Sequence, residues 1–269
     1  MKNWQIFELE CFNYLNKNFS NNYIEFEYLG SSDSTVSDIS VIKNNHKVFT
    51  IEVKMPKSQS GQFVLSPNFK TNTFIYSKKN KTKINRYSNN IIKYMNKNFS
   101  FYSDTKRNSK KINLDSNLFA NWIISYYKTK SVKYIITQNH NGSFIILPLS
   151  KISDYFDISA VYRIKKSGSA NPSRANLQEI KELLKINNID INKLEFNNKK
   201  LYLYTNSEVH NHSKFSSDKY DYLFNKISRN IFNVRRLSRT YNSNVIFSLE
   251  LIKEQDENDF NNFINDLEI

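Results

Sequence analysis

The chain has 269 residues, 39% of them hydrophobic, so it is long enough to bury a core and to fold without a partner. Lys and Arg number 39 against 25 Asp and Glu, and the net charge of +14 favours a polyanionic partner such as nucleic acid or an acidic membrane surface. A single cysteine excludes an intramolecular disulfide, and the longest apolar runs are too short to span a bilayer, so we expect a cytoplasmic protein without a membrane segment.

The first elements in chain order are a helix and a β-hairpin. Residues 4–19 place apolar side chains at intervals of three and four, which predicts an amphipathic helix. Residues 23–28 alternate as a strand does. Two further β-rich runs, 36–42 and 47–55, are joined by a polar turn at 44–46, and this pattern predicts a hairpin.

The rest of the chain alternates between helices and strands. Helices are expected at 84–99, at 115–128, just after residue 150, at 177–186 and at 257–267, and strands at 132–136, 143–147, 160–164, 201–205 and 244–252. Because strict βαβ spacing is absent, an α/β fold with a mixed central sheet flanked by helices is favoured over a barrel or bundle. Four Gly and four Pro leave no room for a linker, so we expect a single domain over 1–269, with a catalytic core at about 1–165 and a C-terminal part at about 166–269.

Two carboxylates and a lysine converge on one face of the predicted hairpin. Alternation along residues 49–55 places Glu52 and Lys54 opposite the apolar side chains, and the same rule sends Asp38 of the partner strand towards them. Two carboxylates can hold Mg²⁺, which polarises a phosphate and acidifies a bound water, while a lysine orients that water or stabilises transition-state charge. The pattern fits phosphodiester hydrolysis, and a solvated strand face with a cross-strand ion pair is the alternative.

Glu8 is a candidate fourth member of this site. Winding the first helix at 100° per residue places Glu8 within the apolar stripe, whereas Glu10 points away. An acid on a buried stripe needs a partner. A third carboxylate facing the metal site and a salt bridge to a core lysine are both consistent with this position.

Two polar segments have the composition of a DNA-contacting surface. Residues 56–70 directly follow Lys54 and are rich in amides, hydroxyls and lysines, which bind phosphates and base edges. Residues 162–174 contain four cations among small and polar residues. For both segments a solvated polar loop is the alternative. The candidate DNA contacts are Lys57, Gln59, Gln62, Asn68, Arg163, Lys165, Lys166, Ser167, Ser169 and Arg174.

The sequence lacks the motifs of several other kinds of site, namely HNH nuclease, zinc and nucleotide-binding sites. His210-Asn211-His212 spells HNH, but nucleases of that name draw their residues from separated parts of a ββα unit. Four histidines and one cysteine provide no zinc site of ordinary spacing. There is also no Walker loop or Gly-rich dinucleotide motif, so no nucleotide cofactor is expected.

The residues around the hairpin resemble a known enzyme family. The signature consists of Ser32 to Ile39, Ile51 to Pro56 and Ser58 to Leu65, and together these resemble the PD-(D/E)XK nucleases, specifically the type II restriction endonucleases. Further similar segments lie at 3–8, 121–128, 163–169 and 244–248, and the likeness is weakest from 188 to 228.

This resemblance implies a restriction-endonuclease fold and Mg²⁺-dependent cleavage of double-stranded DNA at the palindrome GCGC, after its third base, with a cognate methyltransferase protecting the host. By motif position, Asp38 and Glu52 would be metal ligands and Lys54 the catalytic lysine. Ser37 replaces the Pro of the family name, at a commonly degenerate position. A less specific repair or recombination nuclease, or a catalytically inactive DNA-binding protein, remains an alternative, and the number of subunits on the duplex stays open, with a monomer among the options.

Overall fold

The computed structural model describes residues 3–30, 36–104, 108–166 and 168–268, and the chain divides into two compact units. Unit 1 comprises Met1–Arg163 together with Ser243–Ile269, and unit 2 comprises Ile164–Asn242. The sequence suggested a division near residue 165, where unit 2 begins. Residues 243–269, expected in the C-terminal part, instead belong to unit 1. Unit 2 is therefore an insertion within the sequence of unit 1.

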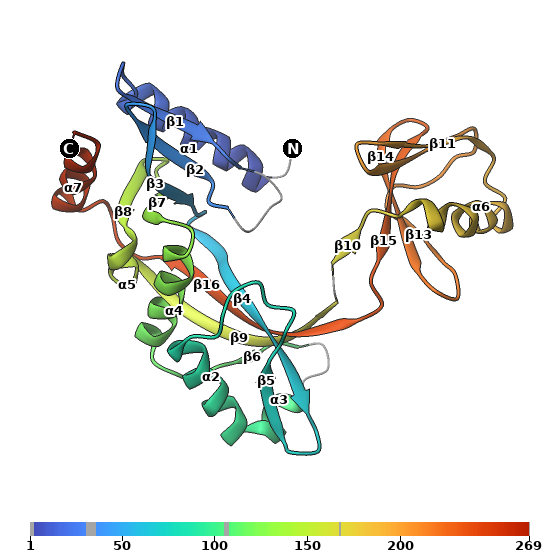
Figure 1. The fold of residues 1–269 in the computed structure, drawn as a ribbon, viewed down its shortest axis with the longest axis horizontal. Coiled ribbons are helices and arrows are strands. Elements are labelled where there is room, and N and C mark those ends of the chain that lie inside the picture. The colour runs from blue at the N-terminus through green and yellow to red at the C-terminus, as the bar shows by residue number, and fades with distance from the viewer. Residues whose placement is uncertain (1–2, 31–35, 105–107, 167, 269) are drawn as a thin grey trace. The chain divides into compact units, whose positions relative to one another are not determined.

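Unit 1 contains a mixed sheet that includes the predicted hairpin (Figure 1). In spatial order its strands are β1 (Ile24–Tyr28), β2 (Ile39–Lys43), β3 (His46–Val53), β7 (Val132–Gln138) and β8 (Phe144–Pro148). β3 and β7 are parallel, whereas the other neighbours are antiparallel. The expected mixed sheet with flanking helices is thus confirmed.

Two helices from opposite ends of the described chain cover one face of this sheet. α1 (Asn3–Phe19) contributes buried Cys11 and Leu15, and α7 (Glu257–Glu268) contributes Phe263 to the same hydrophobic cluster. Phe49, Ile51 and Val53 of β3 point into this cluster, as their alternation predicts. The intervening side chains of β3 consequently point to the opposite face.

A second sheet of unit 1 is antiparallel in each described pairing. Its strands are β5 (Thr73–Tyr76), β4 (Lys57–Asn68), β16 (Tyr241–Leu251), β9 (Phe156–Lys166) and β6 (Lys110–Lys111). Helices α2 (Arg86–Lys97), α3 (Phe99–Ser103), α4 (Ser116–Lys128) and α5 (Ile152–Tyr155) complete the unit. Trp122 of α4 stacks on Phe247 of β16 with ring centroids 4.2 Å apart, which joins α4 to this sheet.

Strand β4 occupies the segment for which a polar loop was the alternative expectation. Its inner face buries Phe63 and Leu65, and it pairs with β16 on one side and β5 on the other. The register shifts near Gly61, whose φ of +95° suits a residue without a side chain. A Cβ at Gly61 would also lie 2.9 Å from the Trp122 ring.

Unit 2 is a β-sheet with one helix packed on it. The strand order is β11 (Ile191–Asn197), β12 (Lys200–Thr205), β15 (Ile231–Leu237), β14 (Asp221–Ser228) and β13 (Ser213–Ser216), with β10 (Ser169–Ala170) on β15. α6 (Leu177–Ile186) packs through Ile180 and Leu184 against Leu203 and Phe232. The predictions of helix 177–186 and strand 201–205 are confirmed, whereas β11, β13, β14 and β15 were not predicted.

The other predicted elements occur within a few residues of their expected bounds, and the strand expected at 160–164 is part of the longer β9. Short helical turns lie at Leu149–Lys151 and Arg174–Asn176. Within the described ranges no helix combines the length and apolar character needed to cross a membrane.

Candidate active site

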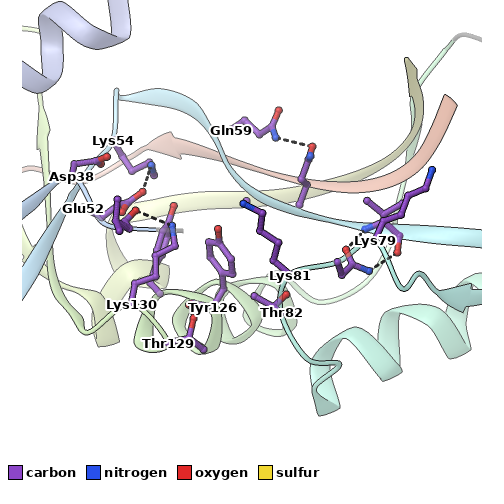
Figure 2. A pocket seen from close by; sticks show the side chains of 16 residues that line it. Asp38, Glu52, Lys54, Gln59, Lys79, Lys81, Thr82, Tyr126, Thr129 and Lys130 are labelled. Carbon is purple, nitrogen blue, oxygen red and sulfur yellow. Dashed lines mark hydrogen bonds and ion pairs between the residues drawn. The ribbon is translucent and has the colours of Figure 1, made fainter. Parts of the chain in front are cut away.

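Asp38, Glu52 and Lys54 meet at the end of the β2–β3 hairpin, as the strand alternation predicts (Figure 2). Ile39 pairs with Ile51, so Asp38 lies close to the end of β3. Its Oδ2 atom accepts a hydrogen bond from the backbone N–H of Val53 at 2.8 Å. The Lys54 Nζ atom donates to Glu52 Oε1 at 2.7 Å, and Glu52 is only 5% exposed.

The electrostatics of the site favour the presence of a further cation. Burial, and then the negative charge of Glu52, raise the pKa of Asp38 to about 7, although Lys54 and the Val53 hydrogen bond act in the opposite direction. Burial alone would lower the pKa of Lys54, but the charges of Glu52 and Asp38 outweigh it, so the net shift is upward. Lys54 is therefore cationic at neutral pH, whereas ionised Asp38 needs additional positive charge.

These side chains fit a magnesium ion. Glu52 Oε2 is buried and has no hydrogen-bond partner among the described residues, so it is available as a metal ligand. Mg²⁺ commonly uses one or two carboxylates together with water and substrate phosphate. Within the described part of the chain, no group of three or more His, Cys, Asp or Glu side chains is arranged for metal binding. Asp38 and Glu52 would therefore hold the ion with oxygen ligands from outside the protein.

The three residues line a cavity of about 570 Å³. The predicted DNA contacts Gln59 and Gln62 of β4 line it. Figure 2 shows further side chains of the lining that sequence reasoning missed, namely Lys79, Lys81, Thr82, Tyr126, Thr129 and Lys130. A sequence signal existed for part of this set, because four lysines stand among residues 78–83.

Two other candidates on β4 lie away from this lining. Lys57 pairs with Glu250 of β16 at 3.1 Å, and both side chains are largely exposed. Asn68 is near the far end of β4, where its side chain accepts a hydrogen bond from the Lys70 backbone. The structure thus separates the β4 candidates into two that face the carboxylates and two that do not.

The candidate DNA contacts within residues 162–174 are divided between the two units. Arg163 is exposed on β9 at the end of unit 1, whereas the others belong to unit 2. Lys166 Nζ lies 3.3 Å from Asp221 Oδ2, and Ser169 accepts hydrogen bonds from Arg235. Lys165 and Arg174 are exposed. Ser167 lies outside the described residues.

Glu8 finds its partner in a residue that the sequence did not indicate. Its Oε2 atom accepts a hydrogen bond from the Tyr28 hydroxyl at 3.0 Å. Burial raises the pKa of Glu8, and the charges of Lys54 and Glu52 also act on it, in opposite directions. Glu8 therefore borders the site electrostatically, and a small cavity is lined by Glu8, Lys54 and Gln59 together.

Comparison with known proteins gives one clear relationship. The chain matches no protein-family model and no curated protein sequence. Among solved structures, it is similar to HhaI endonuclease in complex with DNA, with 39% sequence identity, a TM-score of 0.86 and coverage of 100% of both chains. The chain belongs to the HhaI endonuclease family.

Membership of the HhaI family confirms the fold and the nuclease resemblance found in the sequence. The match covers the whole of both chains, so it includes residues 188–228, where the sequence resemblance was weakest. Unit 2 is therefore part of the shared HhaI architecture rather than an addition to this chain.

Proposed function

We propose that this protein is a Mg²⁺-dependent type II restriction endonuclease that cleaves double-stranded DNA, with GCGC as its recognition sequence. The observation that supports this most is the buried cluster of Asp38, Glu52 and Lys54 in a chain that is 39% identical to HhaI endonuclease, a protein solved with DNA. As part of a restriction-modification system, the activity would be paired with a DNA methyltransferase that protects the same sequence.

The side chains have distinct roles in this proposal. Asp38 and Glu52 would hold Mg²⁺, which would supply Lewis acidity and lower the pKa of a water bound to it. Val53 keeps the Asp38 carboxylate in place through its backbone N–H, and Glu52 keeps the Lys54 ammonium at the site. Lys54 then orients the attacking water and stabilises the negative charge that develops on the phosphorus oxygens.

The charge distribution supports a DNA partner. Unit 2 contains 15 Lys and Arg against 7 Asp and Glu, a net charge of +8 in 79 residues. Such a surface binds the DNA backbone without reading its sequence, and its affinity falls steeply as salt rises. Lys165, Lys166, Ser167, Ser169 and Arg174 of this unit are the proposed contacts. In unit 1, Gln59 and Gln62 are the candidates for contacts near the cleaved bond, and Lys57, Asn68 and Arg163 extend the set.

Digestion of a plasmid tests the proposal. Incubation with Mg²⁺ should give discrete fragments whose sequenced ends fall in GCGC, and EDTA should abolish them. A plasmid methylated at the cytosines of GCGC should resist. Nicks or progressive trimming would instead indicate a repair nuclease of the same fold, and salt-sensitive binding without cleavage would indicate an inactive DNA-binding protein.

A further inference from the structure

The backbone of Lys130 is anchored on the strand that carries the active-site residues. Lys130 follows α4, and its N–H bonds to the carbonyl of Tyr127 at 2.9 Å. Thr50 of β3 donates from its hydroxyl to the Lys130 carbonyl at 3.0 Å and from its N–H to the Ser131 carbonyl at 3.0 Å. Thr50 and Glu52 share one face of β3, and Lys54 directly follows the strand. The backbone position from which the Lys130 side chain extends is thus fixed beside Asp38, Glu52 and Lys54.

Two aromatic rings hold the Lys130 ammonium. Its Nζ atom lies 4.7 Å from the centre of the Tyr126 ring and 5.4 Å from that of Tyr127, and it donates to the Val36 carbonyl at 3.4 Å. Tyr127 is buried, and its ring centre is also 5.5 Å from Lys54 Nζ. One buried ring therefore lies against two ammonium groups. Aromatic faces and a carbonyl stabilise a cation without neutralising its charge.

The charge balance of the cavity suggests what this second cation does. Asp38, Glu52, Lys54 and Lys130 line the same cavity (Figure 2). Lys54 is paired with Glu52, and the Lys130 ammonium adds a positive charge that reduces the repulsion between the carboxylates and an incoming phosphate. Lys79 and Lys81 also contribute positive charge to the lining. An ammonium also has three N–H donors, and the described hydrogen bond to Val36 uses one.

We infer that Lys130 is a second active-site cation, which binds a non-bridging oxygen of the phosphate that is cleaved, with Tyr126 and Tyr127 as its positioning residues. This inference rests on the proposed nuclease function and assigns a residue outside the PD-(D/E)XK signature. In this arrangement Lys54 orients the attacking water, and Lys130 binds the phosphate. Electrostatic stabilisation of developing charge by a pre-positioned donor is among the largest single contributions to enzymatic rate.

The test compares Lys130→Gln and Lys130→Arg with Lys128→Gln. Lys128 is a matched control, because it is exposed at the end of α4, two residues away, and does not line the cavity. Single-turnover cleavage is measured with excess protein, Mg²⁺ and a duplex containing the site mapped for the wild type. Thermal unfolding of each variant checks the fold. We expect Lys130→Gln to slow cleavage about 100-fold, and Lys128→Gln to have less than about a twofold effect. Lys130→Arg should recover most of the rate, because guanidinium also binds phosphate and stacks on aromatic rings.

A binding experiment identifies the phosphate. With Ca²⁺ in place of Mg²⁺, a duplex carrying a neutral methylphosphonate at the mapped cleavage position should bind the wild type more weakly than the unmodified duplex. The same substitution should have a smaller effect on Lys130→Gln. Equal cleavage by Lys130→Gln and Lys128→Gln, or equal methylphosphonate effects in wild type and Lys130→Gln, would overturn the role of Lys130. A wild-type protein that cuts no DNA would overturn the proposed function itself, so the two failures are distinguishable.

Discussion

The carboxylate of Asp38 is held by the backbone N–H of Val53 at 2.8 Å, so the hairpin partner strand, rather than a basic side chain, fixes its orientation. This bond leaves the repulsion between Asp38 and Glu52 only partly compensated, and the pKa of Asp38 rises to about 7 through burial and that repulsion. A carboxylate held in this way favours a metal ion, because it is pre-oriented and costly to ionise alone.

Replacing Asp38 by Asn should stabilise the metal-free protein while removing cleavage. The pKa of this carboxyl is raised on folding, so the wild type loses stability as pH rises from about 4, the unfolded value, through about 7. In EDTA, Asp38→Asn should therefore melt above the wild type at pH 8, and the gap should shrink towards pH 4. Thermal scans across this range measure the effect. A gap that does not change with pH would contradict it.

Replacing Lys54 by Ala should abolish cleavage and spare DNA binding. In the proposed function the lysine stabilises the transition state, so we expect a rate loss of at least about 100-fold. The change also leaves Glu52 buried without its cation, which should cost about 3 kcal/mol of stability in EDTA. Mg²⁺ should restore part of that loss, because it supplies a replacement cation. Gel-shift assays in Ca²⁺ and urea unfolding with and without Mg²⁺ check these expectations.

The buried hydroxyl pair of Ser60 and Tyr127 offers a double-mutant cycle. Their oxygens are 3.0 Å apart, and both residues are buried. Tyr127→Phe leaves the Ser60 hydroxyl unpaired and should cost about 1–2 kcal/mol. Adding Ser60→Ala should cost little more, because it removes the orphaned group. Tyr102→Phe is a control for the loss of a tyrosine hydroxyl that does not bond to Ser60. Tyr102 is also buried, and it donates to the Lys111 carbonyl at 3.2 Å. Additive losses for Ser60 and Tyr127 would show that their hydroxyls do not interact.

Unit 2 should lose stability in acid through Asp221. The Lys214 ammonium lies 3.0 Å from this carboxylate, and with Arg239 and Lys166 it lowers the pKa of Asp221 well below its usual range. A depressed pKa contributes stability above about pH 4, the unfolded value. That contribution is lost as pH falls further. The protection of peptides from 213–240 against hydrogen exchange, taken relative to the intrinsic exchange rate at each pH, should therefore fall below pH 4 in the wild type.

Asp221→Asn is the control for this acid effect. Its 213–240 peptides should already be less protected than those of the wild type at pH 7, and they should lose less additional protection on acidification. Peptides from β3 report on unit 1 in the same samples and should respond equally in both proteins. An identical acid response of the 213–240 peptides in the two proteins would exclude Asp221 as the cause.

The part of the site that could be predicted from the sequence is the part encoded locally. Glu52 and Lys54 are two residues apart on one strand, so period-two alternation places them on one face. Asp38 joins them through a hairpin, which is also a local connection. Lys130 is brought next to these residues by the parallel pairing of β3 with β7. Nothing in the sequence near residue 130 indicates this pairing with a strand some 80 residues earlier.

The difference between local and long-range signals also explains which strands were not predicted from the sequence. β4 was not predicted because its polar face lines the cavity while only Phe63 and Leu65 mark its buried side, so the apolar pattern is short. In β14 and β15, polar residues such as Asn225 and Asn233 alternate with Phe224 and Val234, and the strands are joined by a turn of two residues. The pairing of β14 with β15 is stabilised by a hydrophobic core to which β12 and α6 also contribute. The sequence of no single segment therefore predicts this pairing.

The nested arrangement of the units sets an order for synthesis. β16 lies between β4 and β9, and α7 packs against β8, yet the unit 1 residues of β16 and the whole of α7 follow unit 2 in the chain. On the ribosome, all strands of unit 2 emerge before unit 1 receives its central strand. The inserted unit can therefore fold first, while the second sheet and the core of unit 1 stay incomplete until residues 243–269 have been released. A nascent chain of this enzyme would thus acquire its basic surface before it acquires the framework for cutting.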